Sequence, residues 1–303
     1  MSLLQRIALT PVKNLLTDVE NRRIYSLNHC ELNVFETYRA AEQVQLTFND
    51  LVITSMVRGK KVMHLPGIED FEYLPGETVL APAGTKMTID FPDAKEQEPT
   101  QCIALTLDGH CISQAIHYLN TNFPRLNEQT GWQFNYRQFH LKNNRSLAEV
   151  IDKLVGICSE TAVTKDILAD LTLKELIVRM VQLQALETAE HTKHTGSDDP
   201  FSYVIRYIND HLHDKLDVDS LSRKACMSRP SFFRLFKREF GISPVQFIIR
   251  ERLKRARALL SNTNQSIQQV SLEAGFDDAN HFIRLFKKNE GLTPGDYRSR
   301  LIS

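Results

Sequence analysis

One segment of this chain occurs twice in its C-terminal third. Residues 227–244 read MSRPSFFRLFKREFGISP and residues 277–294 read DDANHFIRLFKKNEGLTP, with matching positions 50 residues apart. Both copies contain Phe-x-Arg-Leu-Phe-Lys and end in Gly-(Ile/Leu)-(Ser/Thr)-Pro. A segment that recurs at a fixed spacing is typical of a supersecondary unit that is used twice. This part of the chain must therefore fold as two similar units, which restricts its architecture more than composition does.

Each copy has the spacing of a helix with one buried face. Positions i, i+3 and i+4 lie on the same side of a helix, so Phe232, Leu235 and Phe236 form one apolar stripe. A step of about 100° per residue places Arg234 and Lys237 roughly opposite that stripe. The second copy repeats this arrangement at Asn280, Phe282, Arg284, Leu285, Phe286 and Lys287.

A shorter apolar segment precedes each copy, over residues 221–225 and 270–274. A short helix, a tight turn and a second helix with a basic face is the helix-turn-helix arrangement. Two such units with Arg-Leu-Phe-Lys cores and Gly-x-(Ser/Thr)-Pro ends resemble the C-terminal DNA-binding domain of AraC/XylS-type transcriptional regulators. The resemblance covers residues 200–300, about a third of the chain. It implies an all-α domain of two helix-turn-helix units joined by a linker helix.

Five side chains of the two units are expected to contact DNA bases. Arginine can donate two hydrogen bonds to guanine O6 and N7, and asparagine suits adenine N6 and N7. The candidates for base contact are Arg229, Arg234, Asn280, His281 and Arg284. An alternative for Arg234 and Arg284 is that they brace the fold by pairing with carboxylates, and the sequence leaves this open.

Four more basic side chains are expected at DNA phosphates, where they add affinity without reading sequence. These are Lys237, Arg238, Lys287 and Lys288. The chain has no net charge, but residues 200–303 hold 18 Lys and Arg against 11 Asp and Glu, so the first 199 residues hold 19 against 26. A basic domain joined to an acidic one is typical of a DNA-binding protein with a separate regulatory module.

A helix is expected to join the two units. Ser243-Pro-Val-Gln246 combines a capping box with a proline at the first helical position, and the helix should run to Leu260. Ser228 is likewise expected to cap the first recognition helix. Most of the basic residues of the joining helix are expected to face solvent or phosphate, and none is expected to read a base; they are Arg250, Arg252, Lys254, Arg255 and Arg257.

The first half of the chain reads as short strands separated by turn-forming pairs such as Asn49-Asp50 and Pro75-Gly76. Six or more short strands at close spacing predict a small barrel or jelly roll. The predicted strands are Val44–Phe48, Leu51–Val57, Lys60–Leu65, Glu77–Ala81, Lys86–Phe91 and Gln101–Leu107.

The segment from Pro75 to Gly84, PGETVLAPAG, resembles the turn and strand of cupin-like sensor domains. Many cupins place metal-binding histidines after that turn, but here Thr85-Lys86-Met87 follows and no His-x-His occurs. The five cysteines are odd in number and lack Cys-x-x-Cys spacing, which favours reduced thiols. We therefore expect no metal and no cofactor.

A barrel of this size can enclose one small ligand. Polar or reactive side chains on or beside the predicted strands are the candidates for binding such an effector. They are Arg58, His64, Lys86 and Cys102. Each has the alternative of being a surface or packed residue, since pockets use few polar groups.

Helices are predicted to follow the strands, over residues 112–119, 147–158 and 165–186. The last is apolar on more than one side, and such a helix usually has two packing partners. One partner can be the barrel and the other the same helix of a second subunit, so a homodimer is expected; burial within one chain is the alternative. In AraC-type regulators the helices after the sensor barrel commonly form the dimer contact, as the resemblance implies.

These observations predict an α+β multidomain protein. The expected division is a cupin-like effector-binding barrel over residues 1–140, a helical dimerisation region over 141–190 and a polar linker over 191–199, followed by the AraC-type DNA-binding domain over 200–303. The barrel is expected to be small and flanked by helices. No run of 18 apolar residues occurs, so neither a membrane span nor a signal peptide is expected.

The sequence thus predicts a cytoplasmic, sequence-specific transcriptional regulator, an activator, controlled by a small-molecule effector bound in the barrel. Its expected partners are operator or promoter DNA in double-stranded form, the unidentified effector, a second copy of the chain and RNA polymerase. One alternative is a regulator whose barrel serves only for dimerisation. Another is a cupin-type enzyme fused to a DNA-binding domain, but no metal ligands or acid-base set were found for it, so no enzyme activity is expected.

Overall fold

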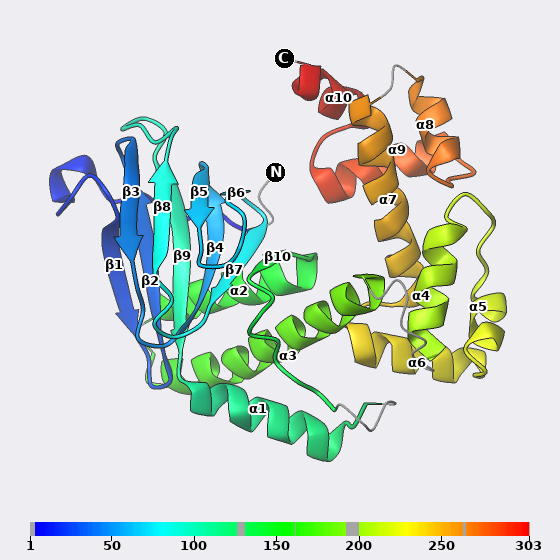
Figure 1. The fold of residues 1–303 in the computed structure, drawn as a ribbon, viewed down its shortest axis with the longest axis horizontal. Helices are drawn as coiled ribbons and strands as arrows, with labels where there is room; N and C mark the ends of the chain where they lie inside the picture. Colours follow the sequence, from blue (N-terminus) through cyan, green and yellow to red (C-terminus); the bar gives the residue numbers. More distant parts are fainter. Residues whose placement is uncertain (1–3, 126–130, 161, 192–199, 263–264, 303) are drawn as a thin grey trace. The chain divides into compact units, whose positions relative to one another are not determined.

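The computed structural model describes residues 4–125, 131–160, 162–191, 200–262 and 265–302. The chain forms two compact units, Met1–Gln184 and Ala185–Ser303, and the division falls within one long helix, α3 (Lys165–His191). The predicted linker over 191–199 lies outside the described residues except for His191. The predicted β-rich N-terminal part and helical C-terminal part are confirmed (Figure 1).

In its described part, the first unit contains ten strands in two antiparallel sheets that face each other. The six-stranded sheet has the order β1-β2-β9-β4-β7-β10, and the four-stranded sheet has the order β3-β8-β5-β6. The strands are β1 (Asn21–Ser26), β2 (Cys30–Thr37), β3 (Ala41–Leu46), β4 (Leu51–Arg58), β5 (Lys61–His64), β6 (Phe71–Tyr73), β7 (Glu77–Ala81), β8 (Met87–Phe91), β9 (Thr100–Leu107) and β10 (His140–Lys142).

Strands β1, β2, β6 and β10 were not predicted from the sequence. Strand β2 lies between β1 and β9, and nearly all of it is buried. Its Asn33 and Glu36 are fully buried, and both are hydrogen-bonded, Asn33 to Arg22 and Glu36 to Gln101. Buried polar residues that are satisfied by neighbouring strands hide the alternation on which strand prediction depends.

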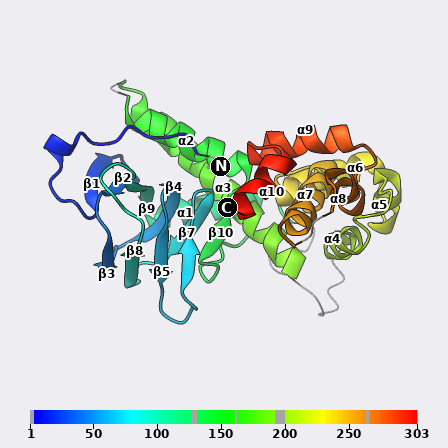
Figure 2. The same ribbon diagram turned by 90° about the horizontal axis from the view of Figure 1, so that it is seen from above.

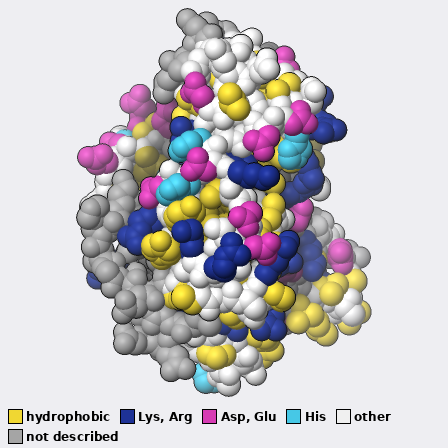
Figure 3. Space-filling view, turned by 90° about the vertical axis from the view of Figure 1, so that its right-hand side faces the viewer, with side chains coloured by type: hydrophobic (Ala, Val, Ile, Leu, Met, Phe, Trp, Pro, Cys, Tyr) yellow, Lys and Arg dark blue, Asp and Glu magenta, His cyan; other side chains and the backbone are white. Residues whose placement is uncertain are grey.

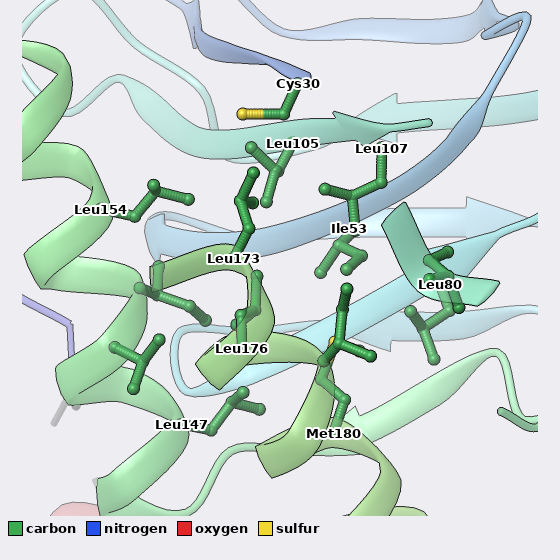
Figure 4. Close-up of a cluster of buried hydrophobic side chains, with 14 of the residues drawn as sticks. Cys30, Ile53, Leu80, Leu105, Leu107, Leu147, Leu154, Leu173, Leu176 and Met180 are labelled. Carbon is green, nitrogen blue, oxygen red and sulfur yellow. The ribbon is translucent and has the colours of Figure 1, made fainter. Parts of the chain in front are cut away.

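Two apolar cores share the six-stranded sheet. The first fills the space between the two sheets and includes Phe35, Met56 and Phe91. The second lies on the other face of the six-stranded sheet, where α1 (Gly109–Asn122), α2 (Arg145–Cys158) and α3 cover it. Figure 4 shows Leu147, Leu154, Leu173, Leu176 and Met180 of these helices pointing toward Ile53, Leu80, Leu105 and Leu107 of the sheet. The predicted barrel is therefore a β-sandwich whose interior is filled by side chains. Helices pack on the outer face of its six-stranded sheet.

Local sequence signals position several of these elements. Asp108 caps α1 by accepting a hydrogen bond from the backbone of His110, and Asn144 caps α2 in the same way at Leu147. Gly76 has φ 95° in the turn that the cupin-like segment predicts, a left-handed conformation that glycine adopts without steric cost. This turn directs the chain into β7.

The described part of the second unit is helical. Besides the end of α3, it contains α4 (Pro200–Asp210), α5 (Val218–Lys224), α6 (Arg229–Phe240), α7 (Pro244–Asn262), α8 (Ile267–Glu273), α9 (Ala279–Glu290) and α10 (Pro294–Ile302). Helices α5 and α6 form the first helix-turn-helix pair, and α8 and α9 form the second. Figures 1 and 2 show α7 running between the two pairs, as the sequence predicts.

Phenylalanines from the repeated segments form the two cores of this unit. Phe232 and Phe236 are fully buried with Phe201 of α4, and Phe282 and Phe286 are fully buried at the other end of α7. The apolar stripe predicted from the repeat is thus confirmed, because the i and i+4 phenylalanines of both copies face inward. On the opposite faces of α6 and α9, the Arg and Lys side chains of the repeated Arg-Leu-Phe-Lys core are exposed.

Candidate nucleic-acid interface

Helix α6 is fixed at both ends by the residues that its sequence predicts. The Ser228 side chain accepts a hydrogen bond from the backbone N–H of Ser231, and Gly241 ends the helix at φ 73°. Between these ends, Arg234 and Lys237 are exposed on the side away from the buried phenylalanines. Both therefore project from a rigid helix.

Helix α9 repeats this design. Asp278 caps it by accepting from the backbone of Asn280, and Gly291 ends it at φ 76°. Asn280, His281 and Arg284 are all exposed. Because Arg284 lies at the position of Arg234, the two helix-turn-helix units present a guanidinium at the same place.

The alternative role for these two arginines, bracing the fold through carboxylates, finds no support in the structure. Neither Arg234 nor Arg284 has an ion-pair partner among the residues that the structure describes. Arg229 differs, because its Nη1 lies 3.3 Å from Asp219 Oδ2 at the start of α5. This exposed pair is worth little in water, so Arg229 can exchange its partner for a phosphate or a base.

The four predicted phosphate contacts divide into two kinds. Lys237, Lys287 and Lys288 are exposed, whereas Arg238 is half-buried. Figure 3 shows groups of Lys and Arg side chains on one face of the molecule, with acidic side chains between them. The surface is therefore mixed in charge, in keeping with the modest basic excess of the second unit.

The five basic residues of α7 differ in exposure: Lys254 and Arg255 are exposed, whereas Arg250, Arg252 and Arg257 are half-buried. Arg252 is half-buried and donates to the carbonyl oxygens of Leu212 and Asp214, at 3.0 Å and 2.8 Å. Arg257 pairs with Glu290 at the end of α9. The helical spacing marks both as polar, but only the tertiary fold brings their partners within reach.

The four predicted effector contacts of the first unit have separate surroundings. Arg58 donates to the carbonyl oxygen of Ile7, at 3.1 Å. His64 lies between two carboxylates, Cys102 is buried in the core between the sheets, and Lys86 is exposed. No hydrogen bond or ion pair joins any two of the four within the described residues. Their role in effector binding stays a prediction.

A surface pocket of about 460 Å³ lies at one end of the two sheets. Its walls come from the β1–β2 turn, the β3–β4 turn, β9 and the start of α1, and they include Arg22, Glu31, Phe48, Asp50 and Thr106. None of the four predicted residues lines it. This pocket was not predicted, because β1, β2 and the turn between them supply much of its wall and neither strand was expected from the sequence.

A second feature that sequence reasoning missed is a buried lysine. Lys61 is 3% exposed, and its Nζ lies 3.1 Å from Glu20 Oε1 and 3.1 Å from Cys102 Sγ. The signal that could have found it is the alternation of β5, which places Lys61 on the same face as Met63. Among the described residues, no group of three His, Cys, Asp or Glu side chains could hold a metal ion.

Two family models match the chain and together cover most of it. One, described as a helix-turn-helix domain, matches residues 221–300. The other, described as the N-terminus of AraC-type transcriptional regulators, matches residues 29–187, which is more than half of the chain. The first match spans α6 and α9. The second spans both sheets from β2 onward and most of α3, and it ends three residues beyond the division between the units.

Curated relatives are named as an operon regulatory protein and as a transcriptional activator. The chain is 32% identical to the arabinose operon regulatory protein of Escherichia coli K12 over 124 residues, 41% of this chain and 42% of that protein. It is 26% identical to the protein of the same name from Salmonella typhimurium over 252 residues, 82% of this chain and 83% of that protein. It is 25% identical to the HTH-type transcriptional activator RhaS of Salmonella heidelberg over 55% of this chain and 59% of that protein. Two of these three alignments thus span less than two thirds of the relative.

Proposed function

We propose that this chain, which belongs to the AraC-type transcriptional regulators, binds DNA by inserting α6 and α9 into the major groove. Arg234 and Arg284 read bases there. The observation that carries the proposal is the equivalence of these two arginines, which are exposed at the same position of two repeated helices. Asn280, His281 and Arg229 are secondary candidates for base contact. Lys237, Lys287, Lys288 and Arg238 would bind phosphates.

The length of α7 suits two contacts on one side of the duplex. Its 19 residues span about 28 Å at 1.5 Å per residue, whereas successive major grooves lie about 34 Å apart. Two recognition helices held by such a rod can enter adjacent grooves if the DNA bends toward the protein. Sequences with flexible pyrimidine–purine steps between the two contacts should therefore bind better.

Binding of the full-length protein to the DNA upstream of its own gene tests this function. A scrambled duplex of the same composition is the control, and both are measured at two salt concentrations. A preference for the natural sequence that survives higher salt is expected for a regulator that reads bases. Equal binding of both duplexes that disappears with salt would reduce the second unit to electrostatic attachment and would contradict the proposal.

We further propose that the first unit binds a small effector and that the protein activates transcription. The names of the relatives, an operon regulatory protein and a transcriptional activator, support this role. The pocket beside Arg22, Glu31 and Phe48 is the first place that we propose for the effector. The alternative contacts are the four residues expected from sequence, none of which lines this pocket: Arg58, His64, Lys86 and Cys102. A shift in melting temperature on adding candidate metabolites, lost in Phe48→Ala, would identify the ligand and the pocket together.

The proposed assembly is a cytoplasmic homodimer that works with RNA polymerase and has no enzyme activity. Three apolar side chains on α3, Ile167, Leu168 and Leu171, are 63%, 39% and 59% exposed, which supports a second copy as their partner. For the chain as a whole we propose the division that the sequence predicts. It consists of a barrel over 1–140, a dimerisation region over 141–190, a linker over 191–199 and a DNA-binding domain over 200–303. Among the described residues, no helix has the length and apolar character needed to cross a membrane.

A further inference from the structure

An amine, a thiol and a carboxylate meet in the interior of the first unit. Lys61 Nζ lies 3.1 Å from Cys102 Sγ and 3.1 Å from Glu20 Oε1. Lys61 is 3% exposed and Cys102 is 2% exposed, so the amine nitrogen and the sulfur are both shielded from water. The same ammonium lies 4.8 Å from the ring centroid of Phe91, which limits the directions in which it can move.

The three groups come from three separate parts of the chain. Lys61 lies on β5 of the four-stranded sheet and Cys102 on β9 of the six-stranded sheet, so their contact crosses the sandwich. Glu20 precedes β1, and its backbone N–H donates to Thr37 Oγ1 at 3.0 Å. Its second oxygen, Oε2, is buried and accepts no hydrogen bond within the described residues. The ion pair between Lys61 and Glu20 does not need the Cys102 thiol. The contact between this thiol and Lys61 therefore calls for another explanation.

We propose that Cys102 and Lys61 form an oxidative cross-linking site, in which a peroxide joins Sγ to Nζ through one oxygen atom. A bridge of one atom lets sulfur and nitrogen stay near their present separation of 3.1 Å. A direct S–N bond would require the two sheets to approach to covalent distance. The oxygen bridge is therefore the product that suits this geometry.

The reaction consumes two molecules of peroxide. The first oxidises the Cys102 thiol to a sulfenic acid: sulfur loses two electrons, the O–O bond breaks, and one water leaves. In the second step an N–O bond forms between Nζ and the sulfenic oxygen, while one N–H and one O–H bond break. Nitrogen loses two electrons to the second peroxide, which is reduced to two waters. One thiol, one amine and two peroxides thus give the bridge and three waters.

Glu20 has a defined part in this reaction. The amine must give up the extra proton of its ammonium before nitrogen can form the new bond, and Glu20 Oε1 is close enough to accept it. Burial raises the pKa of the Cys102 thiol, although Lys61 works to lower it. Burial works to lower the pKa of Lys61, but Cys102 and Glu20 raise it overall. The resting pair is therefore a thiol and an ammonium, which react slowly and only when an oxidant is supplied.

Peroxide treatment of the full-length chain tests the proposal. Cys226 is the one exposed cysteine of the chain, so the experiment uses Cys226→Ser to remove the site that would react first. We expect a gain of about 14 Da, one oxygen for two hydrogens, and a peptide in which Cys102 is linked to Lys61. Dithiothreitol should release the link. A Cys102 that ends as sulfinic or sulfonic acid, or that stays a thiol in excess peroxide, would overturn the proposal.

Two variants separate the bridge from other oxidation. Lys61→Arg keeps a cation beside the sulfur but has no primary amine, so the linked peptide should disappear and Cys102 should proceed to higher oxidation states. Glu20→Gln should slow bridge formation several-fold without changing its product. The same adduct in Lys61→Arg would show that Lys61 is not the partner. A melting temperature that rises on oxidation and returns with dithiothreitol would confirm that the bridge joins the two sheets.

Discussion

The Arg252 guanidinium donates a hydrogen bond from Nε to the carbonyl oxygen of Leu212, at 3.0 Å, although 40 positions separate the two residues. The same side chain donates from Nη2 to the backbone carbonyl oxygen of Asp214. Its guanidinium carbon lies 5.8 Å from the ring centroid of Phe276. Leu212 follows α4, Arg252 belongs to α7, and Phe276 lies in the turn of the second helix-turn-helix. One arginine thus joins α7 to the α4–α5 connection and to the turn of the second helix-turn-helix.

Replacing Arg252 with methionine should destabilise the second unit. It removes two charge-assisted hydrogen bonds and leaves the carbonyl oxygen of the buried residue Leu212 without this donor, at a cost of about 1.5–3 kcal/mol in the free energy of unfolding. Urea unfolding of the full-length chain measures this change. Arg255→Met, at an exposed position of the same helix, is the matched control and should stay within about 0.5 kcal/mol of the parent. Equal effects of the two variants would refute a bracing role for Arg252.

Gly275 should tolerate no side chain. It has φ 94°, and a β-carbon there would lie 1.9 Å from the Leu212 carbonyl oxygen and 2.8 Å from Arg252 Nε. The first helix-turn-helix has Cys226 at the matching place, with φ 54°. Gly275→Ala should therefore cost more than about 3 kcal/mol or prevent folding of the second unit. Thermal unfolding of the full-length chain measures this loss. The control is Gly295→Ala in α10, which should be neutral because its β-carbon would meet only Thr293 Oγ1, at 3.9 Å.

Arg284→Ala and Lys287→Ala should weaken DNA binding in different ways. Loss of a bidentate arginine costs about 1–3 kcal/mol and relaxes preference at one base position, whereas loss of a phosphate contact weakens all sequences alike and lowers the salt slope by about 1. Binding to a panel of single-base operator variants at several salt concentrations measures both effects. If Arg284→Ala lowers affinity uniformly, this residue is a phosphate contact.

His64 should make the stability of the first unit depend on pH. Its Nε2 lies 2.9 Å from Asp90 and its Nδ1 lies 2.8 Å from Asp70, and these hydrogen bonds raise the pKa of His64 above 6.5. A raised pKa means that the stabilisation is fully present below pH 6.5 and is lost as the pH rises through the folded-state value. The difference in melting temperature between the parent and His64→Gln should therefore be larger at about pH 6 than at about pH 8.5. These two values are chosen to lie on either side of the deprotonation of His64 in the folded state.

Asp90 adds the opposite dependence at lower pH. Hydrogen bonds from the Gln43 backbone and from His64 lower the pKa of Asp90 below 3.8. Its contribution is present above pH 3.8 and is lost as the pH falls through the folded-state value, so both groups stabilise the fold between pH 3.8 and 6.5. A histidine NMR titration that places His64 at or below 6.5 would contradict this account.

Leu171→Asp should abolish dimers if α3 forms the subunit contact. The residue is 59% exposed, so a charge there should change the free energy of unfolding of a monomer by less than about 0.5 kcal/mol. In a dimer interface the same charge would be buried without a partner and should raise the dissociation constant at least about tenfold. Analytical ultracentrifugation measures it. Leu16→Asp, at a 91% exposed leucine of the N-terminal segment, is the control and should leave the dimer intact.

Much of the second unit could be predicted because its signals are local. The repeat places Phe232 and Phe282 inside and Arg234 and Arg284 outside by helical periodicity alone. Ser243 and Gln246 exchange the two hydrogen bonds of the predicted capping box, at 2.9 Å and 3.2 Å. Each of these features depends on residues within one or two turns of a helix, so the sequence contains all the information needed.

Turn-forming pairs, apolar periodicity and the repeat are thus enough to predict a β-rich half and a helical half that carries two equivalent basic helices. The folded structure was needed to show that Arg252 is bonded to the carbonyl oxygen of Leu212, whereas Arg234 is exposed. It was also needed to show that Lys61 is buried while Lys60 pairs at the surface with Glu72. The reason is physical. Whether a charged side chain faces solvent or a partner depends on groups that the fold brings from distant positions, and no local spacing encodes them.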